Sequence, residues 1–156
     1  MPVIVVGADT DVGLAVVEAL SSRAGELRAF VSDPRAGTEL KARGIKTAVG
    51  DVSDAGHVGA AACECFGAVL VGAAAVDARE RAFADAPEAV LAGWAEGLAD
   101  AGIRRAIWVL PRAMRVPTIP HATEVAVVDG EAPPTEIARE VARLDDLPSL
   151  GPGPGP

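Results

Sequence analysis

Tyrosine is absent from this 156-residue chain, and its lysines are Lys41 and Lys46 alone. Aromatic residues make up 3% of the chain although half of it is hydrophobic, so a core has to be built from Val, Ala, Leu and Ile. The length suits one domain that buries such a core. Without tyrosine, every mechanism in which a phenolate moves a proton is excluded.

Basic residues are also scarce, because 14 Lys and Arg stand against 22 Asp and Glu and give a net charge of −8. Binding to nucleic acid needs clustered cations, so nucleic acid is not a predicted partner. No apolar run approaches the roughly 18 residues of a membrane span, and no basic, apolar leader opens the chain. We therefore expect a soluble, cytoplasmic protein with no membrane partner.

Cysteine is limited to Cys63 and Cys65. On a helix this spacing points the two side chains to different faces, which suits neither a mutual disulfide nor a shared metal ion. We expect small buried thiols, and we predict no metal site anywhere in the chain.

Short apolar runs alternate with amphipathic segments along most of the sequence. The runs are apolar throughout, which is typical of parallel strands covered on both faces. The expected strands are residues 3–6, 27–31, 45–49, 68–71, 103–110 and 124–128. The expected helices are residues 12–22, 38–43, 55–65, 86–101 and one that starts at Pro134.

This alternation predicts an α/β fold, a three-layer, doubly wound parallel sheet of about six strands in the order 3-2-1-4-5-6. Residues 1–148 are predicted to form a single Rossmann-like domain, and the Gly- and Pro-rich residues 149–156 a disordered tail. In such sheets ligands bind at the carboxyl ends of the strands, beside the switch point between strands 1 and 4.

The first predicted strand leads into Gly7-Ala8-Asp9-Thr10-Asp11-Val12-Gly13 and then into a helix. A strand, a glycine turn and a helix N-terminus together build the phosphate cradle of dinucleotide-binding folds. Thr10 puts a Cβ where a glycine lets the backbone approach a pyrophosphate. Asp9 and Asp11 add carboxylates, each repelling a phosphate by about 3 kcal/mol at ~5 Å and an effective dielectric near 20. Alternatively, Thr10 or Asp11 caps the helix and consumes the donors that a phosphate would use.

Two later motifs stand at matching places. Val31-Ser32-Asp33-Pro34 ends the second strand, and Gly50-Asp51 closes the third. Together with Gly7-x-x-Thr10-x-x-Gly13, and in their order and spacing, they resemble the atypical short-chain dehydrogenase/reductase superfamily, especially its NmrA-like branch, over about residues 3–145. The resemblance implies NAD or NADP as the cofactor. It places the binding site at Gly7, Ala8, Asp9, Thr10, Asp11, Val12, Gly13, Ser32, Asp33, Arg35, Asp51, Val52, Gly72, Ala73 and Ala74.

The choice between the two dinucleotides stays open. If Asp33 faces the ribose, it accepts hydrogen bonds from the hydroxyls and favours NAD, whereas Arg35 favours NADP if it faces the site. Alternatively, Asp33 and Pro34 form a plain turn and helix start.

The glycine turn is also similar to the phosphate loop of dethiobiotin synthetases, in which the last glycine is followed by Lys and Thr. Leu14 and Ala15 occupy those two places here. Phosphoryl transfer would therefore lack the ammonium on the phosphates and the hydroxyl on magnesium.

The resemblance also implies a catalytic tyrosine, a lysine four residues later and a serine after the fifth strand. The sequence there reads Leu110-Pro111-Arg112, so we predict no catalytic residue. Roles for His121 in proton transfer, and for Arg112 and Arg115 in holding an anion, stay open. Relatives with a full substrate pocket carry around a hundred further residues, which argues against a self-sufficient reductase.

Three functions remain as hypotheses. The first is a non-catalytic NAD(P)-binding or sensing domain, and the second a degenerate scaffold that self-associates or docks a partner. The third is an oxidoreductase or epimerase completed by another chain. A stripe of Val90, Leu91, Trp94 and Leu98 on the long predicted helix either forms a homodimer face or packs on the sheet.

Overall fold

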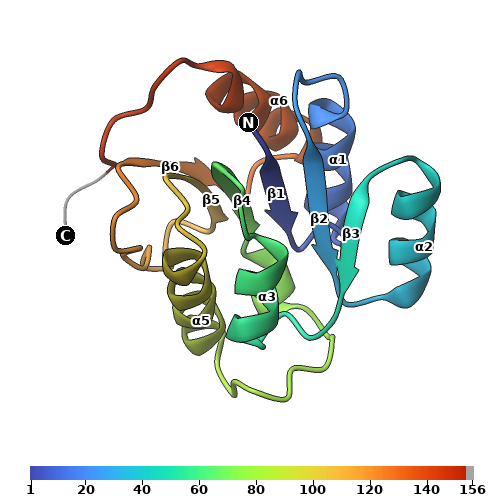
Figure 1. Cartoon of the computed structure of the whole chain (residues 1–156). Coiled ribbons are helices and arrows are strands. Elements are labelled where there is room, and N and C mark those ends of the chain that lie inside the picture. The colour runs from blue at the N-terminus through green and yellow to red at the C-terminus, as the bar shows by residue number, and fades with distance from the viewer. Residues whose placement is uncertain (154–156) are drawn as a thin grey trace.

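The computed structural model describes residues 1–153 and gathers six strands into one parallel sheet (Figure 1). Its strand order, β3-β2-β1-β4-β5-β6, confirms the predicted doubly wound topology. All five strand pairings are parallel, and Val3 pairs with Leu27 on one side and Gly67 on the other. The strands are β1 (Val3–Val6), β2 (Leu27–Val31), β3 (Lys46–Val49), β4 (Gly67–Val71), β5 (Arg105–Leu110) and β6 (Glu124–Asp129).

Helices cover both faces of the sheet (Figure 1). One face carries α1 (Asp11–Leu20), α2 (Pro34–Ala42) and α6 (Pro134–Asp146). The other carries α3 (Ala55–Ala61) and α5 (Pro87–Asp100). A single short turn of helix, α4 (Ala73–Val76), follows β4 at the carboxyl edge of the sheet.

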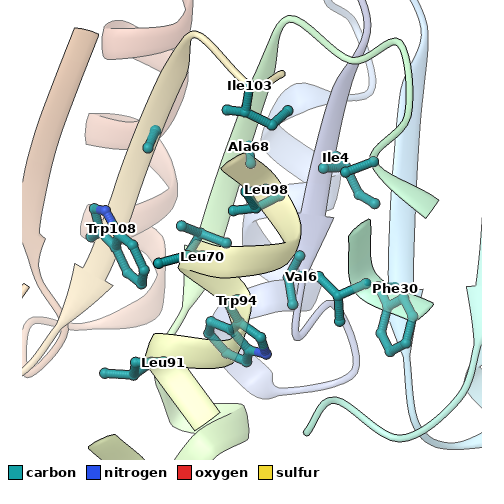
Figure 2. Packing of buried hydrophobic residues seen from close by; sticks show 14 of the residues in the cluster. Ile4, Val6, Phe30, Ala68, Leu70, Leu91, Trp94, Leu98, Ile103 and Trp108 are labelled. Atoms are coloured by element: carbon teal, nitrogen blue, oxygen red, sulfur yellow. The ribbon is translucent and has the colours of Figure 1, made fainter. Parts of the chain in front are cut away.

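Each strand sends alternate side chains into two separate cores. In β1, Val3 and Val5 pack toward α1 and α6, whereas Ile4 and Val6 pack toward α3 and α5. The second core holds the large side chains of Trp94 and Phe30 beside Val6, as Figure 2 shows. Burial on both sides explains why the strands are apolar throughout.

The helices α3 and α5 approach each other backbone to backbone. A Cβ added to Gly59 would lie 2.7 Å from the carbonyl oxygen of Gly97, and one added to Gly97 would overlap the carbonyl oxygen of Ala55. Any larger side chain at either glycine would therefore force the two helices apart.

The connection from β5 to β6 contains no helix. Residues 111–123 cross instead on the α5 side of the sheet, where Ile119 is buried and Met114 and Val116 pack against the core. Apolar side chains of this irregular segment thus cover the end of the sheet, whereas crossover helices cover it elsewhere in the molecule.

The two largest differences between predicted and observed element boundaries, four residues each, have local reasons. Helix α2 starts at Pro34 rather than at residue 38, because the Asp33 carboxylate accepts a hydrogen bond from Arg35 N and proline suits the first helical position. Helix α3 ends at Ala61, and the chain turns through Glu64 with a left-handed φ of 68°.

The chain end was predicted as a disordered tail from residue 149. Leu150 N donates to Glu124 Oε1 at 2.5 Å, and Val125 N donates to the Gly151 carbonyl at 3.0 Å. Residues 149–153 therefore run alongside β6, and residues 154–156 lie outside the described part of the chain.

Candidate functional site

The glycine turn after β1 is tightly packed. Gly7 has φ of +85°, and a Cβ there would lie 2.9 Å from the Ala74 Cβ. A Cβ on Gly13 would overlap the Gly7 carbonyl oxygen. These two positions bring the first turn of α1 against β1 and α4, the close helix–strand packing that dinucleotide turns need.

Thr10 caps helix α1, as one of the two alternatives for this residue predicted. Its Oγ1 accepts a hydrogen bond from Gly13 N at 2.8 Å and donates to the Gly7 carbonyl at 2.9 Å. The amide of Gly13 is therefore consumed inside the protein. The amides of Asp11 and Val12 open the helix and have no acceptor within residues 1–153, so two donors remain available at the start of α1.

Asp9 does not stand as an unpaired charge beside the turn, which corrects the expectation of a repulsive carboxylate. Its Oδ2 accepts hydrogen bonds from Ser32 N at 2.9 Å and Asp33 N at 3.0 Å. Its Oδ1 accepts from Arg79 Nη1 at 2.8 Å. Asp11, by contrast, lies exposed in the first helical turn, where a negative charge favours the helix dipole.

Residues 77–86, called the strap from here on, link α4 to α5 across the carboxyl edge of the sheet (Figure 1). Arg79 reaches from the strap to Asp9 and also binds Asp77 through two nitrogens, at 2.6 and 2.7 Å. Arg81 donates to the Ala74 carbonyl at 3.0 Å and so fastens the strap to α4.

The strap also contacts the loop that follows β3. Ala82 N donates to Asp51 Oδ2 at 2.7 Å, and Phe83 N donates to Ser53 Oγ at 3.0 Å. The Ser53 hydroxyl in turn donates to Asp51 Oδ1 at 2.6 Å. Polar groups thus hold the middle of the strap over the ends of β1, β2 and β3.

These contacts shift the pKa values of three ionisable groups, Asp51, Asp77 and Arg79. Burial alone would raise the pKa of the Asp51 carboxyl, but hydrogen bonds from Ser53 and Ala82 outweigh burial and lower that pKa. The pKa of Asp77 is lowered against its burial in the same way by Arg79. Burial opposes the charged form of Arg79, yet its two carboxylate partners raise its pKa. All three groups are charged at neutral pH.

A hollow of about 530 Å³ opens between the strap and the ends of β1, β2 and β3. It lies where a Rossmann sheet binds the adenosine half of its ligand. Its lining residues are Asp9, Ser32, Asp33, Gly50, Asp51, Arg79 and Glu80. The structure thus brings four predicted site residues together, whereas Arg35 is exposed on α2 outside this lining.

The remaining predicted site residues surround the ends of β3 and β4. Val52 is fully buried, and its carbonyl accepts a hydrogen bond from Trp94 Nε1 at 2.6 Å, so it has a structural role. Gly72 begins the turn into α4, where a Cβ would lie 3.0 Å from the Val109 carbonyl. Ala73 and Ala74 follow it in α4, with Ala74 packed against Gly7.

The side chains considered for substrate chemistry lie after β5. His121 is exposed in the 111–123 connection with a left-handed φ of 70°. Arg112 and Arg115 are exposed as well, and the guanidinium of Arg112 is 3.6 Å from Asp129. Within residues 1–153, none of these three side chains makes a hydrogen bond to the strand ends.

The other predicted features are placed as follows. Cys63 is exposed and Cys65 is buried, and burial raises the pKa of the Cys65 thiol. In the described part of the chain, no cluster of three or more His, Cys, Asp or Glu side chains could hold a metal ion. No helix of residues 1–153 combines the length and apolar character needed to cross a membrane.

The apolar stripe of α5 faces its own sheet rather than a second copy of the chain. Trp94 and Leu98 are fully buried, and Val90 and Leu91 are 1% exposed. Figure 2 shows three of these side chains, Leu91, Trp94 and Leu98, in the core. A homodimer through α5, which stays a prediction, would have to use the opposite face of that helix.

Sequence reasoning missed the strap and its arginines. Arg79 is 70 positions away from Asp9, so no local pattern pairs them. One signal was available, because Asp77-Ala78-Arg79-Glu80-Arg81 places two arginines together in an acidic chain directly after the β4 edge.

The fold is similar to solved structures of three reductases. An anaerobillin reductase from Escherichia coli O157:H7 gives a TM-score of 0.73 at 16% identity, over 98% of this chain and 94% of that chain. A triphenylmethane reductase of Citrobacter sp. with NADP(H) gives 0.60 at 14% identity, over 92% of this chain and 45% of that chain. An Escherichia coli quinone oxidoreductase with NADPH gives 0.58 at 19% identity, over 70% and 36%. The chain therefore spans less than half the length of the last two.

No curated protein sequence matches the chain. A sequence family described as NAD(P)H-binding matches residues 7–121, from the glycine turn through the strap to the connection after β5. This match agrees with the retained glycine turn, the two free amides of α1 and the hollow at the carboxyl edge. It also confirms the predicted resemblance to NmrA-like short-chain dehydrogenases/reductases. This chain belongs to the NAD(P)H-binding family.

Proposed function

We propose that the chain binds NAD(P)H across the carboxyl edge of its sheet and works as a binding or sensing domain without an acid or base of its own. One contrast carries this proposal. The ends of β1 to β3 form a built polar hollow, whereas the titratable side chains of residues 111–123 are exposed and lie outside its lining, with Arg112 paired to Asp129 at the end of β6.

The residues fit the three parts of a dinucleotide. The hollow beside Asp9 and Asp33 supports binding of an adenosine ribose, because carboxylates accept hydrogen bonds from sugar hydroxyls. The amides of Asp11 and Val12 support a pyrophosphate at the start of α1. The small residues at the β4 exit, from Gly72 onward, stand on the far side of the turn from the hollow, where the nicotinamide end would lie.

A second candidate is an NAD(P)H-dependent reductase of a conjugated acceptor. The anaerobillin reductase is matched over 94% of its length, so a protein of this extent supports reduction without an added lid domain. A reduced nicotinamide supplies a hydride, and a conjugated acceptor stabilises the resulting anion until water protonates it. Such a reaction needs a bound and oriented acceptor but no tyrosine.

Calorimetry and thermal unfolding with NADH and NADPH test binding. At a hundredfold excess over Kd, a ligand adds about 2.7 kcal/mol to the free energy of unfolding, or roughly 5–10 °C in Tm for a domain of this size. Nucleotide oxidation is then followed with menadione or FMN as acceptor. Binding without faster oxidation supports the sensing domain, faster oxidation supports the reductase, and the absence of binding contradicts both. Cytoplasmic location and dimerisation stay predictions.

The Asp11 amide offers a sharper test of the pyrophosphate position. Thr10 has an extended backbone with ψ of 164°, which a following proline favours, and Asp11 is the first helical residue, where proline is tolerated. Asp11→Pro therefore removes one donor and leaves the fold intact. We expect about tenfold weaker binding than in the control Asp11→Ala, which keeps the amide. Equal affinities would place the pyrophosphate elsewhere.

A further inference from the structure

The hollow contains an anion site that one of the protein's own carboxylates fills. Two consecutive amides, Ser32 N and Asp33 N, converge on one oxygen of Asp9, and Arg79 Nη1 binds the other oxygen. Converging backbone amides and a guanidinium are the groups with which proteins bind phosphate. The Asp9 side chain is 6% exposed, so it lies within this site rather than beside it.

Arg79 already uses four of its five N–H donors on protein oxygens. Its side chain is 13% exposed, and besides Asp9 it binds Asp77 through Nε and Nη2 and Ser32 Oγ through Nη1 at 3.3 Å. In many phosphate sites the guanidinium of the arginine is unpaired until phosphate binds. Here most N–H donors of Arg79 already bind protein oxygens.

The net negative charge of the hollow also disfavours binding of a second anion. Its lining has four carboxylates, Asp9, Asp33, Asp51 and Glu80, and one guanidinium. A phosphate monoester would bring close to two more negative charges into this lining. A sugar hydroxyl brings none, and it can donate a hydrogen bond to a carboxylate oxygen.

We infer that Asp9 occupies the place of a ribose 2′-phosphate, so that the protein accepts NADH and rejects NADPH. The inference rests on the proposed dinucleotide site and assigns its specificity to the glycine turn. The end of β2 carries backbone amides, the Ser32 hydroxyl and the exposed Asp33, whose carboxylate caps α2. The quinone oxidoreductase and the triphenylmethane reductase were solved with NADPH and NADP(H), so the nucleotide inferred for this chain differs from the one bound in those two structures.

Removing the Asp9 carboxylate should convert the site. Asp9→Ser frees the amides of Ser32 and Asp33 and one arm of Arg79, and it leaves room for a phosphate. Asp9→Asn removes the charge but keeps an oxygen for the two amides, so it serves if the serine variant folds poorly. Asp11→Ser is the matched control, since it deletes an exposed carboxylate two residues away in the same turn.

Calorimetric titrations with NADH, NADPH, AMP and adenosine 2′,5′-bisphosphate decide the matter. We expect the wild-type protein to bind NADH at least tenfold more tightly than NADPH. In Asp9→Ser the ratio should move at least tenfold toward NADPH, with a smaller shift in Asp9→Asn and less than twofold in Asp11→Ser. Adding Arg79→Gln to Asp9→Ser should abolish the gain, and adenosine 2′,5′-bisphosphate should follow NADPH.

Some results would overturn the inference but leave the proposed function standing. One is equal wild-type affinities for NADH and NADPH, and another is an unchanged ratio of these two affinities in both Asp9 variants. A shift of the same size in Asp11→Ser would overturn it as well, because general repulsion would then explain the preference. If neither dinucleotide binds the wild-type protein or any variant, the proposed function itself fails and this specificity fails with it.

Discussion

Arginines contact both edges of the sheet, buried at the amino edge and half-buried at the carboxyl edge, and they bind different partners. At the amino edge, Arg28 donates to the carbonyls of Ala61 and Cys63, where α3 ends. Arg105 donates to the carbonyls of Leu144, Asp145 and Leu147, where α6 ends. At the carboxyl edge, Arg79 binds side-chain oxygens only.

The difference in partners distinguishes contacts that hold the fold from contacts that a ligand or a mutation can change. A helix C-terminus presents free carbonyls that carry partial negative charge, and a guanidinium there satisfies groups that no mutation or proton can remove. Carboxylates and hydroxyls, by contrast, can be protonated, replaced or exchanged for those of a ligand. The amino edge therefore fixes the fold, and the carboxyl edge can be adjusted without loss of the fold.

The largest effect should come from Arg105→Met. This arginine is 3% exposed and also binds Glu124 at 2.9 Å, so its loss leaves the carbonyls of Asp145 and Leu147 without their donor and leaves Glu124 with the Leu150 amide alone. We expect the free energy of unfolding to fall by about 3–4 kcal/mol, measured by urea denaturation. Arg104→Met, at the exposed neighbouring position, is the control. A loss below about 1 kcal/mol for Arg105→Met would remove the distinction between the edges.

A smaller loss of stability is expected for Arg79→Gln, about 1–2 kcal/mol, because Asp9 keeps the amides of Ser32 and Asp33 as donors and the more exposed Asp77 can turn toward water. Local opening should change more than global stability, so hydrogen exchange of the Ala82 and Phe83 amides should accelerate. Arg35→Gln, which alters an exposed arginine outside the hollow, should change neither measurement. If Arg79→Gln destabilises the protein as much as Arg105→Met does, the carboxyl edge is part of the fixed architecture.

The smallest effect concerns pH. Because the pKa of Asp51 is lowered from 3.8 in the folded protein, its contacts stabilise the fold above that value and are lost as the pH falls through the lowered pKa. Solvent screening limits this contribution to about 1 kcal/mol or less. In Asp51→Asn the acid-induced loss of stability between pH 5 and pH 2 should be smaller by that amount. Asp85→Asn, in the exposed part of the strap, should behave like the wild type.

Residues near one another in the chain explain what the sequence could predict. The unbroken apolar run of Val3–Val6 indicates a strand buried on both faces, and repetition of this pattern leads to the correct topology. The cap formed by Thr10 needs a helix start and a hydroxyl three residues before Gly13, so it is also visible locally. The short α4 was missed because four small residues, Ala73–Val76, contain too little periodicity.

The candidate site was less predictable because its key contact is not local. Asp9 was predicted to lie beside the nucleotide and does line the hollow, but its environment depends on Arg79, which only the folded strap brings within 2.8 Å. Likewise, the α5 stripe was open to two interpretations until Trp94 was seen to donate to Val52 inside the core. Side-chain contacts between segments distant in the sequence, such as Arg79 with Asp9, are therefore visible only in the folded structure.

The backbone contact between Gly59 and Gly97 has a consequence far from the helices themselves. Helix α3 begins four residues after Asp51, and α5 carries the Trp94 indole that binds the intervening turn at Val52. A single methyl group introduced on the outer helical layer would therefore reposition the anchor of the strap. Nucleotide affinity should thus be sensitive to a mutation at Gly59 or Gly97, although neither residue lines the hollow. Substitutions at these two positions during evolution would therefore change the affinity for the nucleotide.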